Sequence, residues 1–285
     1  MLSLNALSTF AIEKPPLREN IAYHFAHISK DESLDGVFGT LIEKLKLKGT
    51  KMERCIIFCQ TRKQCSLVYR LFTAALGNKN FVGEGQSYDQ CLVQMFHAGS
   101  PTSVKSHIIT EMTKEDSHLR ILICTVAFGM GIDCKDLYRS IHFGPSSTVE
   151  NLIQETGRLG RDGKQCFCYV LYNGLLTSHC DHQMKELVER NDCRKHFMRI
   201  LFPATSITYI AKGCICCDNC SQKCECMDHD NISILSFGKK ATVDKKFSSM
   251  RYVSNEQKKI LKEKLLTIEG VLHLLQLRNF YQLVP

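Results

Sequence analysis

Short apolar runs alternate with helix-like patterns between residues 31 and 175, and this alternation constrains the fold more than any other feature. In the helix-like segments, apolar residues recur every three to four positions, as on one side of a helix. Alternating strands and helices imply βαβ units and a mainly parallel sheet. The sequence therefore predicts an α/β fold, a parallel sheet flanked by helices. The expected strands are residues 55–59, 93–96, 120–124, 139–143 and 166–171, and the expected helices are residues 33–47, 62–76 and 103–112.

The remaining segments lack this alternation. Residues 1–30 contain Pro15-Pro16 and are expected to be irregular. Residues 77–90, rich in Gly, Asn and Ser, indicate a surface loop. Residues 177–223 are expected to be helical and are rich in cysteine. A polar, irregular segment is expected over residues 225–247, followed by a helix or helix pair over residues 255–280.

Composition places the chain among ordinary globular proteins. Of its 285 residues, 44% are apolar and 23% are charged, enough for a sizeable core. Its formal charge of +8 permits a polyanionic partner. No segment approaches about 20 uninterrupted apolar residues, so we expect no membrane span. The first ten residues lack a basic start and a long apolar run, so we expect no secretory signal.

The 16 cysteines fall into two sets. Nine lie between Cys55 and Cys180, several in strand-like runs, and are expected to be small buried hydrophobes. Seven lie between Cys193 and Cys226, which indicates a metal site in a reducing compartment. Cys214, Cys217 and Cys220 have the spacing of thiolate ligands, with Cys193 twenty-one residues earlier, so the sequence predicts a structural Zn²⁺. Redox or disulfide chemistry is the alternative. Other candidates for the fourth ligand are Cys216, Cys224, Cys226, His179, His182 and His196.

Two arginines lie between glycines in the segment QETGRLGRDG, residues 154–163, directly after a helix-like pattern at Val149, Leu152 and Ile153. Glycine lets the backbone bend and approach a ligand closely. The guanidinium is planar, always charged and suited to phosphate oxygens. Such a pair suits a nucleotide γ-phosphate, whose charge it would stabilise during phosphoryl transfer. The alternative is a Gly-rich surface turn with two solvated arginines.

Residues 154–163 also resemble the last helicase motif of the RecQ family of ATP-dependent DNA helicases, in superfamily 2. The segment LICTVAFGMGID, residues 122–133, resembles the family's preceding motif. IIFCQTR, residues 56–62, resembles the motif that opens the second motor domain, and MFHAGS, residues 95–100, the element that follows it. All four occur in the family's order, and the resemblance covers roughly residues 15–222.

The resemblance implies a domain order. Residues 1–30 would connect the two motor lobes, and residues 31–175 would form the second, RecA-like lobe. Residues 176–224 would form a small helical zinc-binding subdomain, followed by a polar tail with a C-terminal helix over residues 225–285. The family's Cys-Arg-Arg start is similar to Cys193-Arg194-Lys195, and its ending is similar to the segment CDNC, residues 217–220. The implied ligands are Cys193, Cys214, Cys217 and Cys220.

The resemblance also implies roles for single residues. Arg161 would be the arginine finger, supported by Arg158 and Gln154. Gly131, Asp133 and Gly157 would contact the nucleotide, although the family usually carries Asn where this chain has Asp133. Helix capping by Thr61, a buried polar position for His97 and a plain strand-to-helix turn over residues 127–133 are the alternatives. The implied nucleic-acid contacts are Thr61, Arg62, His97, Thr125 and Phe128.

The chain contains neither Gly-x-x-x-x-Gly-Lys-[Ser/Thr] nor an Asp-Glu-x-His box. Both are needed to hold ATP with Mg²⁺, and family members carry them in the first motor lobe. We therefore expect this chain to be the second half of a 3′-to-5′ DNA helicase. Alone it would neither hydrolyse ATP efficiently nor unwind DNA.

The implied partners are single-stranded or forked DNA and a first motor lobe, in cis or in trans. Work in DNA unwinding, recombination or repair implies the nucleus, with the cytoplasm as the alternative. Two other functions stay open. One is a non-catalytic module that binds nucleic acid or a protein partner, and the other is an RNA-directed helicase relative, against which the zinc pattern argues.

Overall fold

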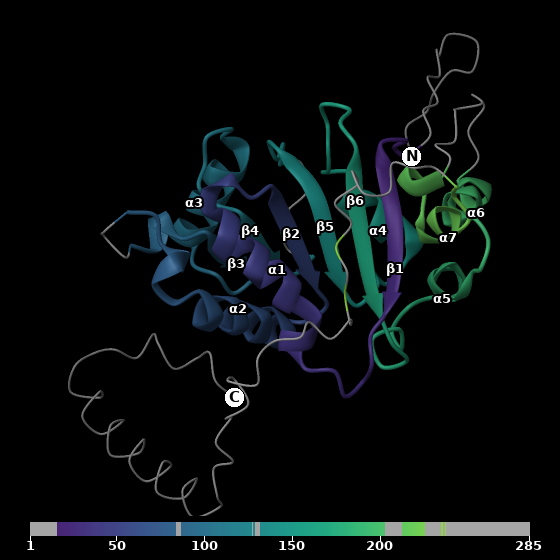
Figure 1. Cartoon of the computed structure of the whole chain (residues 1–285), viewed down its shortest axis with the longest axis horizontal. Coiled ribbons are helices and arrows are strands. Elements are labelled where there is room, and N and C mark those ends of the chain that lie inside the picture. Colours follow the sequence, from purple (N-terminus) through teal and green to yellow (C-terminus); the bar gives the residue numbers. More distant parts are fainter. Residues whose placement is uncertain are drawn as a thin grey trace, which may run out of the picture. The chain divides into compact units, whose positions relative to one another are not determined.

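Six parallel strands form one sheet in the described part of the chain, in the order β1-β6-β5-β2-β4-β3 (Figure 1). The computed structural model describes residues 16–83, 87–126, 128, 132–202, 213–225, 235 and 237. These all belong to one compact unit, residues 1–241, and the second unit, residues 242–285, lies outside them. The expected helix over residues 255–280, and nearly all of the polar tail before it, therefore also lie outside. The strands are β1 (Ile21–His27), β2 (Arg54–Cys59), β3 (Val93–Phe96), β4 (Ile121–Cys124), β5 (Leu137–Phe143) and β6 (Cys166–Tyr172).

Helices cover both faces of the sheet, as the alternation predicts. The helices are α1 (Leu34–Lys48), α2 (Arg62–Leu76), α3 (Thr102–Thr113), α4 (Val149–Thr156), α5 (His182–Glu189), α6 (Arg194–Leu201) and α7 (Asp218–Gln222). Short 3₁₀ turns occupy Gly49–Lys51, Gly77–Asn80, Tyr88–Gln90 and Gly213–Ile215. The predicted parallel α/β fold is confirmed, and so are the five predicted strands and the three predicted helices, within one or two residues at each end.

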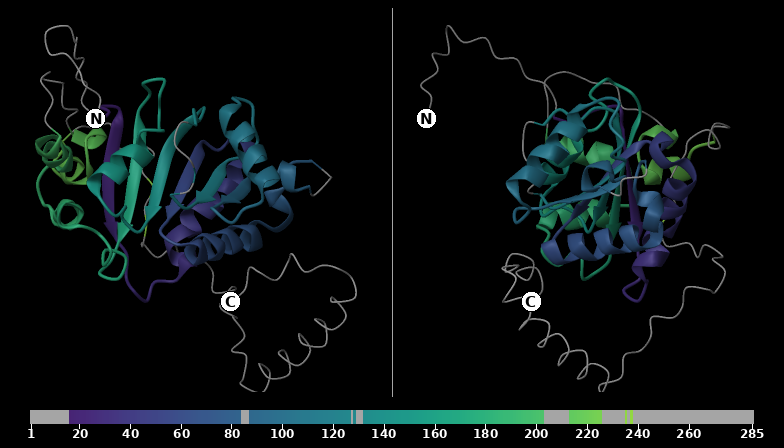
Figure 2. Two further views of the ribbon diagram at one scale, coloured as in Figure 1. Left: turned by 180° about the vertical axis from the view of Figure 1, so that it is seen from behind. Right: turned by 90° about the vertical axis from the view of Figure 1, so that its left-hand side faces the viewer.

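Two separate apolar clusters form the core because successive strand residues face opposite sides of the sheet. In β2, Ile56 and Phe58 join the cluster under α3, α4, α5 and α6, while Cys55 and Ile57 join the cluster under α1 and α2. Figure 1 shows α1 and α2 in front of the sheet, and Figure 2 shows the opposite face. All nine cysteines from Cys55 to Cys180 are buried, as predicted.

The prediction that residues 1–30 are irregular is wrong for Ile21–His27, which form β1. This strand pairs with β6 along its whole length, from Ile21 opposite Cys166 to His27 opposite Tyr172. Its other edge is partly covered, because Tyr23 forms a parallel bridge with Cys217. The first strand of the chain therefore joins the sheet to the cysteine-rich helices.

A buried ion pair ties α4 to the sheet. His142 of β5 is 1% exposed, and its Nδ1 lies 3.2 Å from Oε2 of Glu155 on α4. Ser146 donates a hydrogen bond of 2.6 Å to the same carboxylate oxygen. Burial by itself lowers the pKa of His142, but contacts with Cys168 and Glu155 outweigh it and raise the pKa to about 10. The imidazole is therefore charged at neutral pH.

We expect the chain to lose stability as the pH rises above about 6.5, the ordinary pKa of histidine. In that range the folded protein keeps the His142 proton and the unfolded chain releases it, so the free energy of unfolding falls by up to about 1.4 kcal/mol per pH unit. Urea unfolding under reducing conditions between pH 6 and 8 measures this slope. His142→Gln should flatten it, whereas His179→Gln, at an exposed position, should leave it unchanged. Equal slopes in all three proteins would contradict the charged pair.

Candidate functional site

The sheet brings four of the predicted nucleic-acid residues to one edge. Thr61 and Arg62 follow β2, His97 follows β3 and Thr125 follows β4, and these three strands are neighbours. Carboxyl ends of parallel strands are where α/β proteins bind ligands. Thr61 and Arg62 are exposed, whereas His97 and Thr125 are buried. This edge, Thr61, Arg62, His97 and Thr125, is called the carboxyl edge below.

Thr61 caps helix α2, which was the structural alternative for this residue. Its hydroxyl accepts from the amide of Gln64 at 3.1 Å, and the Gln64 side chain accepts from the amides of Gln60 and Thr61 in return. This capping box satisfies amides that a helix start leaves unpaired. Arg62 is then the first residue of α2, exposed beside the loop that follows β3. Thr61 thus orients Arg62 whether or not it also contacts a phosphate.

His97 and Arg62 converge on Gly99. A Cβ added to Gly99 would lie 3.3 Å from the His97 ring and 3.5 Å from Nη1 of Arg62. Burial, followed by the charges of Arg62 and Lys105, lowers the pKa of His97, so the ring is neutral at neutral pH. Its Nδ1 is buried without a hydrogen-bond partner among the described residues. The ring is held close to the exposed cation of Arg62.

The two arginines of the segment 154–163 have different surroundings. Arg158 is 8% exposed, donates to the carbonyl of Phe128 at 3.2 Å and lies 5.5 Å from the Phe128 ring centre. The Arg161 side chain is 43% exposed and pairs with Asp133 at 2.9 Å. Gln154 is exposed on α4, one turn before Arg158. Gly157–Gly163 is called the arginine turn below.

The arginine turn lies away from the carboxyl edge, beside the start of β5. The amide of Gly160 donates to the carbonyl of Leu137, the first residue of β5, at 2.8 Å. Contacts with Arg161 and Lys135 lower the pKa of Asp133, so this carboxylate is charged. The structure therefore places the predicted finger, Arg161, apart from the carboxyl edge, whereas Arg158 of the same turn bonds to Phe128, the fifth predicted nucleic-acid residue. Residues 125–133 connect the two places. This segment starts at Thr125 of the carboxyl edge and ends at Asp133, which pairs with Arg161.

Phe128 lies inside this connecting segment. Phe128 is 1% exposed, its ring packs edge-on against Phe96 at 5.1 Å, and the Arg158 guanidinium lies over the ring. A ring buried in this way offers no open face to a base, so a nucleic-acid contact here would be limited to the backbone. Gly131, a predicted nucleotide contact, lies outside the described residues. Gly157 bonds within the fold, its amide donating to Ile153 at 2.8 Å.

Four thiols gather beside β1. The sulfurs of Cys193, Cys216, Cys217 and Cys220 all lie within 4.8 Å of one another, and those of Cys193 and Cys216 are 3.6 Å apart. Four thiolates about 2.3 Å from a tetrahedral Zn²⁺ would be about 3.8 Å apart, so the set fits this ion. Three members are predicted ligands, and Cys216 takes the place predicted for Cys214, which is buried outside the group. Cys193, Cys216, Cys217 and Cys220 are called the cysteine group.

Hydrogen bonding among the thiols makes them unequal. Contacts with Cys216 and Cys217 lower the pKa of Cys193, while contacts with Cys193 and Cys217 raise the pKa of Cys216. Thiolates this close repel one another, and a bound cation offsets this repulsion because it binds the thiolate form. The donor set therefore suits a thiophilic divalent metal.

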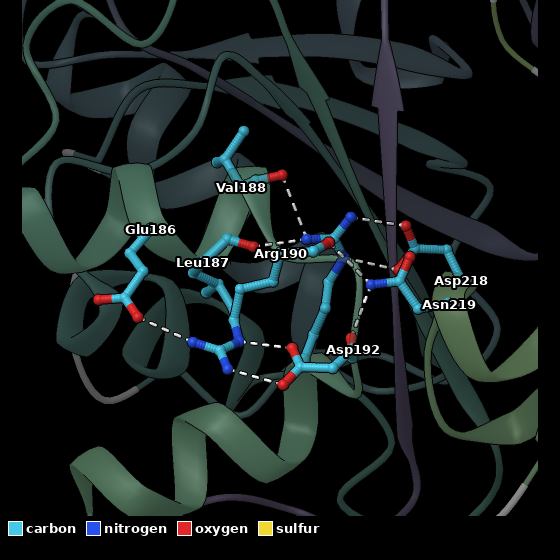
Figure 3. A network of polar contacts seen from close by, with 8 residues as sticks. Glu186, Leu187, Val188, Arg190, Asp192, Asp218 and Asn219 are labelled. Carbon is cyan, nitrogen blue, oxygen red and sulfur yellow. Dashed lines mark hydrogen bonds and ion pairs between the residues drawn. The ribbon is translucent and has the colours of Figure 1, made fainter.

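A polar network fixes the elements that carry the cysteine group (Figure 3). Arg194, directly after Cys193, is 4% exposed and forks onto Asp218 with bonds of 2.7 and 2.9 Å. Its third nitrogen donates to the carbonyls of Leu187 and Val188, near the end of α5. Asn219 donates to the backbone carbonyls of Arg190 and Asp192 at 2.9 and 2.7 Å. Three short helices are thus joined through side chains adjacent to the thiols.

Comparison with known proteins identifies the sheet domain. Residues 37–163 match the helicase conserved C-terminal domain. A protein of Acanthamoeba polyphaga mimivirus, named as an ATP-dependent RNA helicase, is 26% identical over 72% of this chain and 35% of its own length. The bifunctional 3′-5′ exonuclease/ATP-dependent helicase WRN of Mus musculus is 27% identical over 58% of this chain and 12% of its own length. The ATP-dependent DNA helicase Q-like 5 of Arabidopsis thaliana is 27% identical over 61% of this chain and 17% of its own length.

Among solved structures, a DEAD-box helicase bound to single-stranded RNA matches 56% of this chain and 29% of its own, with 21% identity and a TM-score of 0.43. Residues 37–163 are thus similar to the C-terminal domain of helicases. The sequence relatives support a likeness to RecQ-type helicases in particular. The chain spans about a third or less of the length of the curated relatives named above. No helix in the described ranges is long and apolar enough to cross a membrane.

Sequence reasoning missed two residues at the arginine turn, Arg18 and Asn20. Both lie in the segment expected to be irregular, and both bind the backbone of the turn. No residue pattern marks such contacts, because they join positions about 140 residues apart, 142 in the case of Arg18 and Gly160.

Proposed function

We propose that the chain supplies the second motor lobe and a zinc subdomain of an ATP-dependent 3′-to-5′ DNA helicase of the RecQ type. The observation that carries the proposal is the arginine turn, in which one arginine is anchored inside the fold and the other is exposed. An exposed, charged Arg161 can reach the γ-phosphate of ATP with Mg²⁺ held by a first lobe, where it would act as an arginine finger. Arg158, Gln154 and Gly157 would support it.

The carboxyl edge would contact the nucleic acid. Arg62 is exposed and charged, and with Thr61 it begins helix α2, a position suited to a backbone phosphate. Thr125 starts the segment that ends at Asp133, beside Arg161. Closure of the two lobes on ATP would therefore be transmitted to phosphate contacts through this segment. DNA, single-stranded or forked, is proposed as the partner because the Arabidopsis thaliana relative is a DNA helicase by name.

Zinc is proposed for the cysteine group. The group contains Cys193, Cys217 and Cys220, as the sequence predicts, with Cys216 as the fourth ligand in place of Cys214. A closed set of four thiolates leaves no open position, so this ion would be structural rather than catalytic. It would hold α6 and α7 together, because these elements carry Cys193 and Cys220 at or near their starts.

We expect Cys216→Ser to lose zinc and Cys214→Ser to retain it. The first change removes a sulfur of the cysteine group, and the second removes a buried thiol outside it. Metal analysis after dialysis against a mild chelator should give about one zinc per wild-type chain and per Cys214→Ser chain. Zinc retained by Cys216→Ser and lost by Cys214→Ser would restore Cys214 as the fourth ligand.

ATP turnover tests the proposed function. The chain is joined to a RecQ-type first lobe that carries the phosphate loop, and hydrolysis is measured with single-stranded DNA, with RNA of the same sequence, and without either. Stimulation by DNA supports the proposal, whereas stronger stimulation by RNA would favour an RNA-directed relative. Strand displacement on substrates with opposite tails tests the 3′-to-5′ polarity.

The alternative is a non-catalytic binding module. Its support is that the exposed Arg62 and the helix start at Thr61 suit a phosphate backbone whether or not ATP is turned over. Under this alternative the chain binds DNA or a protein partner without turnover, even when a first lobe is supplied. Work in DNA repair or recombination would place either form in the nucleus, which a tagged full-length protein tests.

A further inference from the structure

Two side chains from the N-terminal segment bind the backbone of the arginine turn. The guanidinium of Arg18 donates to the carbonyls of Gly157, Leu159 and Gly160 at 3.4, 2.9 and 2.6 Å. The amide of Asn20 donates to the carbonyls of Gly160 and Lys164 at 2.9 and 2.7 Å. Every one of these acceptors lies within or directly after the turn that carries Arg158 and Arg161. Arg18 and Asn20 are called the backbone clamp.

Gly160 is fixed from several sides at once. Its carbonyl accepts from both clamp residues and from the amide of Gly163, and its own amide donates to Leu137 of β5. Its φ of +46° favours glycine, and an added Cβ would come within 2.2 Å of the Cys166 sulfur and 2.8 Å of the Asn20 amide nitrogen. Gly160, which directly precedes Arg161, is therefore held in one backbone conformation.

The clamp segment is itself anchored on its other side. The backbone carbonyl of Glu19 accepts from Lys195 of α6 at 2.7 Å, and the Glu19 carboxylate pairs with Arg199 at 3.4 Å. Further along, the Tyr23 hydroxyl lies 3.1 Å from the hydroxyl of Thr156, the last residue of α4. The clamp is thus a fixed part of the fold rather than a loose strand end.

A cation at this place is favourable despite two other arginines close by. The carbonyls that Arg18 binds belong to Gly157, the C-cap of α4, and to Leu159 and Gly160 just beyond it, where a cation also faces the negative end of the helix dipole. Arg18 supplies a planar fork of donors to these carbonyls, which a lysine cannot match. Without the fork, the carbonyls of Leu159 and Gly160 would have to turn toward water, and the side chains between them would turn with the backbone.

We propose that Arg18 and Asn20 are positioning residues, which hold the arginine turn in the geometry that lets Arg161 reach the nucleotide. This role rests on the proposed helicase function, since Arg161 acts on ATP only if a first lobe presents it. Neither clamp residue contacts the nucleotide in this arrangement. Loss of the clamp therefore lowers the rate of the chemical step and leaves the carboxyl edge, and so the affinity for DNA, unchanged.

Hydrogen exchange tests the clamp without any activity. Amide exchange of residues 157–164 is compared in the wild-type chain, Arg18→Ala, Arg18→Lys and Val68→Ala. Val68 is fully buried on α2, away from the turn, so its truncation controls for a general loss of stability. The clamp predicts faster exchange at Gly160 and Gly163 in Arg18→Ala, a smaller rise in Arg18→Lys and none in Val68→Ala beyond its global effect. Unchanged exchange in Arg18→Ala would overturn the clamp.

ATP turnover of the same variants, each joined to a first lobe, tests the positioning role. A shift of about 1 Å in a catalytic group costs on the order of 100-fold in rate, so kcat should fall about 10- to 100-fold in Arg18→Ala. The KM for ATP and the Kd for single-stranded DNA should change less than about 3-fold, and Arg18→Lys should restore part of the rate. A normal kcat in a variant with faster exchange at the turn would overturn the role.

Hydrogen exchange and ATP turnover together distinguish the proposed helicase function from the proposed positioning role of the clamp. If the wild-type lobe pair hydrolyses no ATP, the proposed function fails and the catalytic role of the clamp fails with it, while exchange still decides whether the clamp holds the turn. If the wild type is active and only Arg18→Ala loses rate, both stand. A loss of rate in Val68→Ala as large as that in Arg18→Ala would reduce the effect to stability and overturn positioning.

Discussion

Alanine in place of Arg161 should lower ATP turnover by about 10³-fold or more in a two-lobe protein that contains this chain, which is the range observed for loss of an arginine finger. The side chain is half-exposed, and its pair with Asp133 is accessible to water. Water screens such a pair, so Arg161 can leave Asp133 when a γ-phosphate is presented. Its removal deprives the transition state of a positive charge without opening the core.

Turnover at saturating single-stranded DNA measures this effect, together with the melting temperature. Arg161→Lys keeps the charge but loses the fork, and should recover only a small part of the rate. Arg158→Ala offers a contrast, because the buried Arg158 is bonded to Phe128 and its loss should also lower stability. Near-normal turnover in Arg161→Ala would contradict the finger and favour the binding module.

Replacing Arg54 should lower the free energy of unfolding more than any other substitution proposed for this chain. Arg54 begins β2, is 1% exposed and donates to the carbonyls of Met112, Lys114 and Glu115 at the end of α3. It also donates to the carbonyl of Lys135 at 2.8 Å, just before β5. A buried cation thus satisfies the end of one helix and joins it to two neighbouring segments. Arg54→Met keeps most of the volume and removes a donor from each of these carbonyls, of which that of Met112 still accepts from the amide of Lys135.

We expect Arg54→Met to lower the free energy of unfolding by about 3 kcal/mol, since each buried unsatisfied group costs about 1–3 kcal/mol and water reaches part of the site. In a domain of this size the melting temperature should fall by roughly 6–12 °C. Thermal unfolding with zinc and a reductant present measures it. Arg70→Ala, an exposed arginine on α2, should change the melting temperature by less than about 2 °C, as surface substitutions do. Equal effects of the two variants would contradict this account of Arg54.

The sequence predicts the sheet and its helices well where periodicity is strong. Strands such as Cys55–Cys59 are continuous apolar runs, as expected of strands buried on both faces. Strand β1 escapes prediction because it follows Pro15-Pro16, includes His24 and His27, and forms through pairing with a strand far along the chain. Local pattern carries no information on such a partner.

The candidate site was predicted in composition but not in arrangement. Spacing cannot distinguish Cys214 from Cys216, because the 3₁₀ turn at Gly213–Ile215 decides which sulfur faces Cys193. Nor does spacing show that Arg158 is buried and Arg161 exposed, which depends on the contact of Arg158 with Phe128. The roles proposed for these residues remain predictions.

The place of β1 at the sheet edge has a consequence for biosynthesis. In the described part of the chain, β1 pairs along its whole length with β6, the last strand, and Arg18 finds an acceptor 142 positions later at Gly160. Such distant pairing forms slowly, because a long loop must close before any contact compensates for its entropy. During translation, residues 18–27 leave the ribosome long before β6 is made. The arginine turn therefore acquires its final geometry late, after the central strands have assembled. A nascent chain that ends before Cys166 carries the finger and both clamp residues but lacks β6, the strand that holds the clamp segment beside the turn.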